Sequence, residues 1–483
     1  MSMKKLIITY HGDVETTSFF MTQIESQLQA DGYQVYPLFY DTVPAELSSD
    51  IAAYLQRSPE QAEKDLEGAV FLTFNFAGCY SKDPCLYKDG MLVDRYRMRI
   101  VNILVDHPYH YHDFLYEQIK ERRDRYLQFD LDRQHIAYME RYFPEISLGG
   151  CLPSGGTAYK EEAGEDTADT DERPVDILFA GTYVPPEGFD LFIERNGPEY
   201  SAFYHSMLRE ALADPSAKLE DIIRRRLIEE IEEGVSEDEI RQTLGHVQFL
   251  DYFVRYKRRG EVIRYLADWE PYGDSEDREM PDDTDGEGLH ITIVGSGWEH
   301  LMEQIRHPER ITLLPYADSK EVLQLLTKTK ISLNVLPSFH AGAHDRIWNS
   351  MLCDAVCVTD TNDYLNAFLQ DGENAIVFQT PAIDDDILQT GDDLEESSLR
   401  SDEADDPGDG FVQEDDTAGR HRYRLTAEGE KEMVRLARRI RDLLRPEAED
   451  ERGRITRAGE KLAASQTWAH RTKGLEKVLD ALI

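Results

Sequence analysis

Short apolar runs alternate with amphipathic segments along most of this chain, and this alternation constrains the fold more than any other feature of the sequence. In the first 150 residues the apolar runs lie at 5–10, 35–39, 69–74 and 100–105. After a break the pattern resumes, with runs at 175–180, 290–294, 311–314, 331–336 and 355–359. Strands that alternate with helices are typical of a parallel sheet covered by helices. The sequence therefore predicts an α/β protein with two Rossmann-like domains.

The break between the two patterns marks a domain boundary. Glycine pairs at 149–150 and 155–156 lead into an acidic stretch, and glycine with charge is typical of a connection between domains. We predict a first domain over 1–153, an acidic linker over 154–174 and a second domain over 175–450. Apolar residues at steps of three and four indicate a helical insertion over 199–266. The segment 451–483 is expected to end in one helix from about residue 455, after a helix capped by Thr426.

The formal net charge of −42 is concentrated in three stretches. Residues 160–173, 268–287 and 384–416 together hold 32 acidic and 4 basic residues. Because these stretches are poor in aromatic residues, they cannot bury enough apolar surface to order themselves, and we predict solvated acidic loops. A contact with a basic partner is the alternative interpretation. A nucleic-acid partner is not expected, because binding a phosphate backbone requires a basic face.

Location and redox state follow from what the sequence lacks. It has no run of about 18 apolar residues, so we predict a cytoplasmic protein without a transmembrane segment. The five cysteines are odd in number and scattered, which favours reduced thiols. Cys353 and Cys357 have no second pair with which to form a metal site, so small buried roles are favoured for them.

In open α/β sheets, ligands bind beyond the carboxyl ends of the strands. His11 follows the first apolar run, and Asp106 with His107 follows the fourth. A carboxylate beside an imidazole can hold it as a general base, so His107, Asp106 and His11 are candidate catalytic residues. The spacing of His107, His110 and His112 also allows a metal site or a purely structural cluster.

The most informative strand end lies in the second domain. There a loop of small residues leads into a helix that begins at His344, and a helix N-terminus with a fixed cation at Arg346 suits a diphosphate. The alternative is a capped loop with Arg346 in a salt bridge. Gly295 lies in a second strand-to-helix turn, of the type found beside a bound phosphate. Its motif lacks the third glycine of a dinucleotide fingerprint. The candidate donor-binding residues are Gly295, Ser338, His340, Gly342, His344, Asp345, Arg346, Asn349 and Asp360.

Residues 332–378 resemble the CgeB-like glycosyltransferases of the GT-B superfamily, which are related to glycosyltransferase family 4. The resemblance is carried by an Asn-Val-x-Pro strand end, His-Asp-Arg at 344–346, Met351, AVCVTD at 355–360 and Phe-x-x-Asp-Gly at 368–372. Asp-His-Pro at 106–108, Phe-Ala-Gly-Thr at 179–182, the segment 249–266 and Trp-Ala-His-Arg at 468–471 extend it.

This resemblance implies a cleft between an N-terminal acceptor domain and a C-terminal donor domain, with a terminal helix that crosses back to the first. It implies a hexosyltransferase that moves a sugar from a nucleotide-diphosphate donor, such as a UDP-sugar, to a hydroxyl on a glycan or cell-surface component. No metal or other cofactor is implied. Ala341 and Asn349 stand where the family 4 retaining enzymes have glutamates, so the stereochemical outcome stays open. A sugar-nucleotide epimerase and a non-catalytic module that binds glycan or nucleotide are the alternatives.

Overall fold

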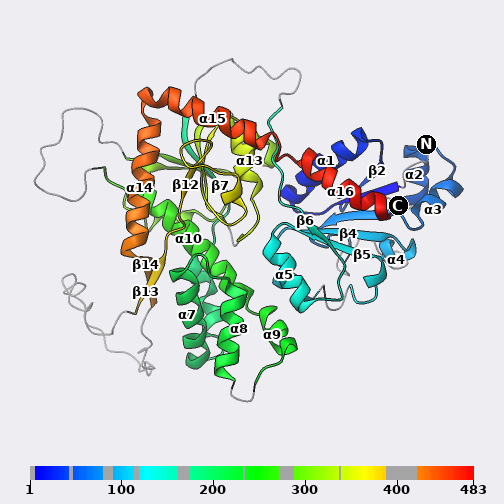
Figure 1. Ribbon diagram of the computed structural model, residues 1–483, viewed down its shortest axis with the longest axis horizontal. Coiled ribbons are helices and arrows are strands. Elements are labelled where there is room, and N and C mark those ends of the chain that lie inside the picture. The colour runs from blue at the N-terminus through cyan, green and yellow to red at the C-terminus, as the bar shows by residue number, and fades with distance from the viewer. Residues whose placement is uncertain are drawn as a thin grey trace, which may run out of the picture.

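The computed structural model describes residues 6–42, 47–79, 91–113, 115, 119–160, 173–231, 234–271, 288–336, 339–387 and 421–482. Two parallel six-stranded sheets form the centres of two domains that lie side by side (Figure 1). The predicted pair of Rossmann-like domains is confirmed by this strand topology. No described helix is both long enough and apolar enough to cross a membrane.

The first sheet has the strand order β2-β1-β3-β4-β5-β6. Its strands are β1 (Leu6–His11), β2 (Gln34–Phe39), β3 (Val70–Phe74), β4 (Arg99–Leu104), β5 (Tyr126–Asp130) and β6 (Leu148–Cys151). Its helices are α1 (Glu15–Ala30), α2 (Leu47–Tyr54), α3 (Pro59–Leu66), α4 (Leu92–Arg95) and α5 (Arg133–Tyr142). Every residue of β1 and β3 is buried, because helices cover both faces of a parallel sheet.

The second sheet has the order β12-β11-β10-β7-β8-β9. Its strands are β7 (Val175–Ala180), β8 (Ile291–Val294), β9 (Ile311–Leu314), β10 (Thr329–Asn334), β11 (Val356–Asp360) and β12 (Ile376–Phe378). Its helices are α11 (Glu299–Met302), α12 (Ser319–Leu326), α13 (Asp345–Leu352), α14 (Ala427–Leu444) and α15 (Glu449–Ala463). Counted along the chain, this order is 3-2-1-4-5-6, the doubly wound arrangement whose ligand crevice lies where the order reverses. That point is between β7 and β10.

The insertion between β7 and β8 connects the two domains. It consists of α6 (Asp190–Glu194), α7 (Pro198–Ala213), α8 (Leu219–Glu230), α9 (Glu237–Leu244) and α10 (Gln248–Asp268), so the predicted insertion over 199–266 is helical. Apolar side chains of α7 to α10 share one hydrophobic core with the first sheet. Arg241 Nη1 donates a hydrogen bond to Tyr142 O at 2.9 Å, and Gln248 Nε2 donates one to Tyr109 O at 3.1 Å. The insertion therefore forms one wall of the interdomain site.

The chain crosses between the domains twice, and the two crossings lie together. Gly156 N–H donates to Gln466 O at 2.9 Å, and Trp468 N–H donates to Gly156 O at 3.2 Å. A Cβ on Gly155 would lie 2.4 Å from Trp468 N, so only glycine allows this approach. The single terminal helix expected from about residue 455 is wrong, because the chain breaks after α15. Helix α16 (Trp468–Leu482) then returns to pack against α1, which completes a GT-B type architecture.

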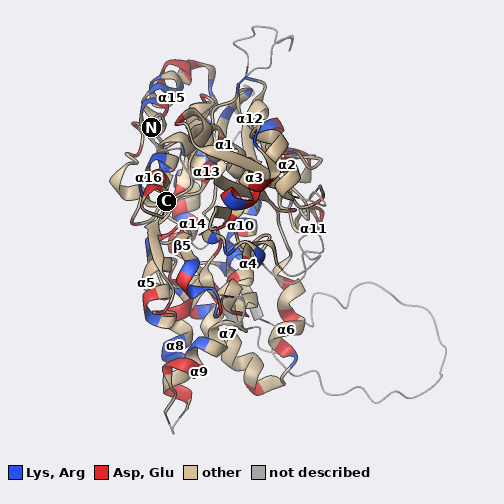
Figure 2. Ribbon diagram, turned by 90° about the vertical axis from the view of Figure 1, so that its right-hand side faces the viewer, with Lys and Arg blue, Asp and Glu red and all other residues tan. Residues whose placement is uncertain are grey.

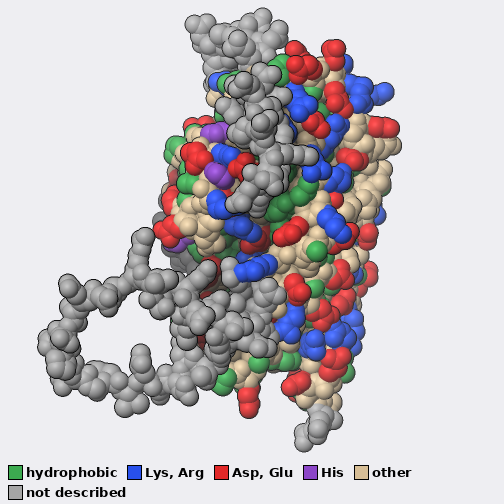
Figure 3. Space-filling view, turned by 90° about the vertical axis from the view of Figure 1, so that its left-hand side faces the viewer, with side chains coloured by type: hydrophobic (Ala, Val, Ile, Leu, Met, Phe, Trp, Pro, Cys, Tyr) green, Lys and Arg blue, Asp and Glu red, His purple; other side chains and the backbone are tan. Residues whose placement is uncertain are grey.

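Parts of two predicted acidic loops are ordered. Asp268 ends α10, is buried and accepts hydrogen bonds from the backbone of Arg306 and His307. Strand β13 (Ile383–Ile387) pairs with β14 (His421–Leu425), and the side chain of Asp385 in β13 is 0% exposed against Arg209. Solvation was therefore the wrong prediction for these residues, while 161–172, 272–287 and 388–416 lie outside the described residues. Charges of both signs mix on α8 and α9 and on the opposite side of the molecule (Figures 2 and 3).

Candidate active site

Two guanidinium groups converge on the carboxyl end of β7, beside the point where the strand order reverses. Arg346, in the first turn of α13, donates from Nη1 to Ala180 O, and Arg259 of α10 donates from Nη1 to Thr182 O. A Cβ on Gly181 would lie 2.7 Å from Arg346 Nη1 and 3.6 Å from Arg259 Nη1. Glycine at position 181 therefore makes room for Arg346, whereas 3.6 Å is an ordinary van der Waals contact for Arg259. The predicted placement of Arg346 at a helix start is confirmed, and the salt bridge of the alternative interpretation is not formed among the described residues.

No carboxylate contacts either of these two cations among the residues that the structure describes. Among the described residues, neither Arg259 nor Arg346 forms an ion pair, and the neighbouring Arg258 donates only to Ala211 O. By contrast, Arg264 on the same helix lies 2.5 Å from a Glu261 carboxylate oxygen. Burial, followed by the charge of Arg346, lowers the pKa of Arg259 to about 9. Because buried charges without a counter-ion are costly, this arrangement suits an anionic ligand with two or more phosphate groups.

Asp360 places a negative charge near this cluster without touching it. Its Oδ1 accepts a hydrogen bond from Leu336 N–H at 2.8 Å, and its Oδ2 accepts one from Thr380 Oγ1 at 2.9 Å. Burial raises the pKa of Asp360 to about 6, although these hydrogen bonds and the charge of Arg258 oppose the shift. The carboxyl is therefore ionised at neutral pH, and its oxygens are already occupied by protein donors.

Three of the predicted donor-binding residues, His344, Asp345 and Asn349, form hydrogen bonds within the protein. His344 caps α13 by accepting the Arg346 N–H at 3.4 Å, and burial lowers its pKa. Asp345 accepts a hydrogen bond from Asn349 Nδ2 at 2.8 Å, and Asn349 Oδ1 accepts one from Thr157 N–H at 2.8 Å. Asn349 therefore connects α13 to the interdomain linker, and both polar atoms of its side chain are bonded within the protein.

The glycines of the predicted donor loops serve backbone packing. A Cβ on Gly342 would lie 2.7 Å from Leu131 O, and the neighbouring Ala341 N–H donates to Asp132 in the first domain at 2.8 Å. A Cβ on Gly295, whose φ is +139°, would lie 2.3 Å from Gly181 O. At Ala341, therefore, the backbone amide that was expected to approach a ligand is bonded to Asp132 instead. Ser338 lies outside the described residues.

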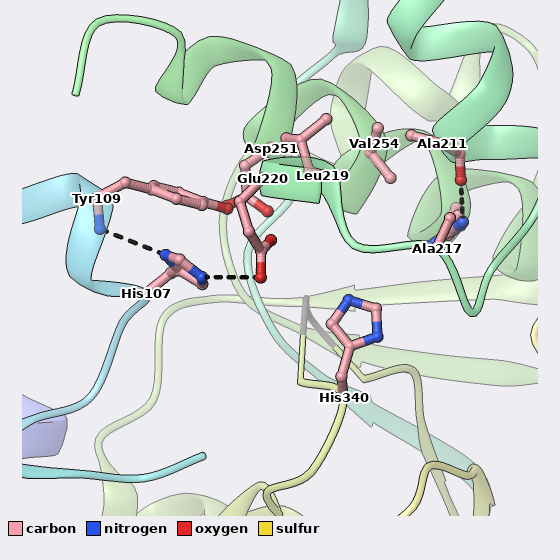
Figure 4. Close-up of a pocket in the computed structure, with 10 residues that line it drawn as sticks. His107, Tyr109, Ala211, Ala217, Leu219, Glu220, Asp251, Val254 and His340 are labelled. Carbon is pink, nitrogen blue, oxygen red and sulfur yellow. Dashed lines mark hydrogen bonds and ion pairs between the residues drawn. The ribbon is translucent and has the colours of Figure 1, made fainter. Parts of the chain in front are cut away.

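A hollow lies between the first domain, the insertion and the β10–α13 loop (Figure 4). His107 and Tyr109 come from the first domain, Glu220 and Arg258 from the insertion, and His340 from the loop. His107 Nδ1 accepts the Tyr109 N–H at 3.3 Å, and its Nε2 lies 3.8 Å from Glu220 Oε1. Burial lowers the pKa of His107 well below 6.5, so the ring is neutral at pH 7. With Nδ1 accepting, the neutral ring carries its proton on Nε2, which faces Glu220.

The predicted pairing of Asp106 with His107 is wrong. Asp106 Oδ2 accepts hydrogen bonds from Asn75 Nδ2 at 3.3 Å and from the Tyr111 hydroxyl at 3.0 Å. Successive residues after a strand point in different directions, so sequence adjacency does not bring the two side chains together. Glu220, which is far away in sequence, faces His107 instead.

Two further interpretations of the histidines need correction. His11 is 3% exposed, stacks on Phe39 and lies 2.8 Å from Glu25 Oε1 of α1, so it does not face the crevice. His110 lies 3.2 Å from Asp251 Oδ2, and His112 Nε2 lies 2.7 Å from the Tyr138 hydroxyl. Within the described ranges, no group of three or more His, Cys, Asp or Glu side chains is placed to hold a metal ion. The cysteines at 79, 151, 353 and 357 are free thiols.

The sequence analysis missed the contribution of the insertion, namely Glu220, Arg258 and Arg259. One signal was available, because residues 255–259 (RYKRR) form a dense basic run in a chain with a net charge of −42. Helical spacing alone assigns such a run to a solvated helix face. Only the packing of α10 against the end of β7 shows that Arg259 is 6% exposed.

One family model matches part of the second domain. A family model described as Glycosyl transferase-like matches residues 278–404, a stretch that contains Gly295, Arg346 and Asp360. It does not reach Arg259 or the first domain. No curated protein sequence matches the chain.

Several solved structures are similar over nearly the whole chain. HepE of Anabaena in complex with UDP and glucose is 8% identical, with a TM-score of 0.43 over 99% of this chain and 100% of that one. Sucrose-phosphate synthase of Thermosynechococcus elongatus is 10% identical, with a TM-score of 0.47 over 99% of both chains. WaaG, a glycosyltransferase involved in lipopolysaccharide biosynthesis, is 12% identical, with a TM-score of 0.41 over 99% of both.

Proposed function

We propose that the protein is a glycosyltransferase that binds a nucleoside-diphosphate sugar, a UDP-sugar in the simplest case, between its two domains. One observation carries the proposal. Arg259 and Arg346 lie over Gly181 at the crevice of a 3-2-1-4-5-6 sheet, and their charges have no carboxylate partner among the described residues. A diphosphate provides the missing negative charge. As the sugar leaves, the charge on the departing phosphate increases, and both guanidiniums are already placed to stabilise it.

The hollow beside Glu220 is proposed to hold the acceptor hydroxyl. Its oxygen forms a bond to the anomeric carbon of the donor, the bond from that carbon to the phosphate oxygen breaks, and the hydroxyl proton passes to Glu220. His107 acts as a positioning residue, because its Nε2–H faces the Glu220 carboxylate at 3.8 Å. We thus assign the proton acceptor to Glu220 rather than to His107, Asp106 or His11.

The donor site is tested by titrating UDP into the wild type and two matched variants in a calorimeter. Arg259→Ala removes a cation without a carboxylate partner, whereas Arg264→Ala removes one on the same helix that is paired with Glu261. A charge-assisted hydrogen bond contributes about 1.5–3 kcal/mol, so Arg259→Ala is expected to weaken UDP binding about ten- to hundredfold. Arg264→Ala should bind UDP like the wild type. Equal affinity in all three proteins would refute the assignment of the diphosphate to this crevice.

Turnover separates transfer from the alternatives. UDP release from UDP-sugars is measured with and without mono- and disaccharide acceptors. Release that depends on an acceptor supports a transferase, and release without one supports hydrolysis or epimerisation of the donor. Binding of UDP with no release from any donor supports a non-catalytic module. In a transferase, Glu220→Gln should lower kcat at least a hundredfold with little change in UDP affinity, because a general base contributes about 10²- to 10⁴-fold.

A further inference from the structure

Three aromatic rings, of Phe189, Tyr252 and Tyr256, lie close together beside the arginine cluster and are called the aromatic patch. Phe189 lies 6.0 Å from Tyr252 and 6.3 Å from Tyr256 between ring centroids, and the two tyrosines are 6.4 Å apart. The three interplanar angles are 14°, 7° and 19°. The three rings are therefore nearly parallel and within stacking distance of one another. All three side chains are half-buried, which leaves part of each accessible.

The patch lies next to the proposed donor site. Tyr252 and Tyr256 are four residues apart on α10 and therefore share one face of the helix. Arg259, which contributes to the diphosphate site, has its guanidinium 5.6 Å from the Tyr256 ring. At the other end, the Tyr252 ring lies 5.0 Å from His110 of the first domain. The patch therefore extends from the donor cations to the domain that faces them.

Polar groups with capacity for hydrogen bonds surround the rings. Arg255 places its guanidinium 5.5 Å from the Tyr252 ring and pairs with Asp251 at 2.9 Å. Neither hydroxyl, of Tyr252 or of Tyr256, bonds to another described residue. An apolar surface with donors and acceptors at its edge matches a ring that is apolar on its face and rich in hydroxyls at its rim.

We propose that Phe189, Tyr252 and Tyr256 form a subsite for a pyranose ring of the acceptor. The inference rests on the proposed glycosyltransferase function and names the acceptor class as a carbohydrate. The C–H groups on one face of a pyranose pack against the aromatic rings, and its equatorial hydroxyls extend sideways to Arg255 and the tyrosine hydroxyls. A nucleobase also stacks on aromatic rings, so the test includes an arm that detects it.

The test measures binding of methyl pyranosides and disaccharides of glucose, galactose, mannose and N-acetylglucosamine to the full-length protein saturated with UDP. Ligand-observed saturation-transfer NMR gives the affinity for each probe. We expect saturable binding of at least one probe to the wild type, weakened about tenfold or more in Tyr252→Leu and Phe189→Leu. Tyr252→Phe keeps the ring and should retain most of the affinity. Tyr200→Leu is the matched control, because Tyr200 is 55% exposed and outside the patch.

The possible outcomes distinguish a failure of the acceptor subsite from a failure of the proposed glycosyltransferase function. If the wild type does not bind UDP, the proposed function fails. If it binds UDP but no carbohydrate probe, or if the leucine variants bind the probes like the wild type, the acceptor subsite is wrong. If Tyr252→Leu weakens UDP itself about tenfold and leaves probe binding unchanged, the patch holds the nucleobase and the acceptor assignment is overturned. Circular dichroism confirms that each variant is folded.

Discussion

The fifth strand of each sheet ends on a buried aspartate, and the two carboxyls differ in charge. Asp130 ends β5, and Asp360 ends β11. Asp130 Oδ1 accepts one hydrogen bond, from Gln128 at 2.9 Å, whereas its Oδ2 has no partner among the described residues. Burial raises the pKa of Asp130 to about 8, but the pKa of Asp360 only to about 6, because two donors and Arg258 favour its ionised form. At neutral pH Asp130 is mostly protonated and Asp360 is mostly ionised.

The same contrast extends to the other strand ends of the two domains. At two other strand ends of the first domain, polar side chains pair with each other, His11 with Glu25 and Asp106 with Asn75. In the second domain, Arg346 contacts a backbone carbonyl and no carboxylate within the residues that the structure describes. A polar strand end thus does not by itself identify a ligand site. The informative property is charge that the protein leaves unbalanced.

The largest expected effect comes from removing both unbalanced cations. In Arg259→Met with Arg346→Met, UDP affinity should fall about a thousandfold, because two charge-assisted hydrogen bonds of about 1.5–3 kcal/mol each are lost. The free energy of unfolding without ligand should stay the same or rise, because replacing buried charges by apolar groups of similar volume is often stabilising. Calorimetry and urea denaturation measure the two quantities. A loss of several kcal/mol in the free energy of unfolding would show that these arginines stabilise the fold. They would then resemble the paired side chains of the first domain.

The pH dependence of stability tests the two aspartates directly. A carboxyl whose pKa is raised by folding destabilises the protein as pH rises from its unfolded value to its folded value. That window runs from about 4 to about 8 for Asp130 and ends near 6 for Asp360. Relative to the wild type, Asp130→Asn should therefore gain about 1.4 kcal/mol per pH unit between pH 6 and 8. Asp360→Asn should show a nearly constant difference over that range.

Urea denaturation of the three proteins at pH 6, 7 and 8 gives these differences. Other titrating groups are shared by all three chains, so their contributions cancel in the comparison. Parallel curves for wild type and Asp130→Asn would mean that Asp130 is ionised in the folded protein. In that case Asp130 and Asp360 would both be charged at neutral pH, and the difference between the two strand ends would be refuted.

The sequence predicted the fold better than the site, for physical reasons. Strands such as β1 are buried on both faces and read as unbroken apolar runs, and the predicted cap of α14 is confirmed by the Gly429 N–H to Thr426 Oγ1 bond at 3.0 Å. Strand β6 was missed because its two central glycines are typical of a loop. The roles of Glu220 and Arg259 depend on how the insertion packs between the domains, a long-range arrangement that leaves no local periodicity.

A smaller effect is expected at His11, where the sequence predicted a crevice residue. Glu25 is 9% exposed, accepts a hydrogen bond from Thr9 and faces His11, so Glu25→Ala leaves buried polar groups without a partner. The expected loss of stability is about 1–3 kcal/mol, with UDP affinity unchanged. Thermal unfolding and calorimetry measure both, and Glu25→Gln, which keeps an acceptor, should lose less. A fall in UDP affinity would contradict this expectation and support the prediction that His11 faces the ligand crevice.

The smallest effect is expected from Gly181→Ala, which keeps both arginines but fills the space beside Arg346. The Cβ added by Gly181→Ala would lie 2.7 Å from Arg346 Nη1, at the movable end of that side chain. Stability should change little because the guanidinium can shift, but the shift takes it off the Ala180 carbonyl that positions it. UDP affinity should then fall about tenfold, the equivalent of about 1.4 kcal/mol. Gly188→Ala is the control, because a Cβ there meets no atom within 4 Å. If both variants bind UDP equally, the cations are not positioned by the β7 turn, and the difference between the two domains lies in charge balance alone.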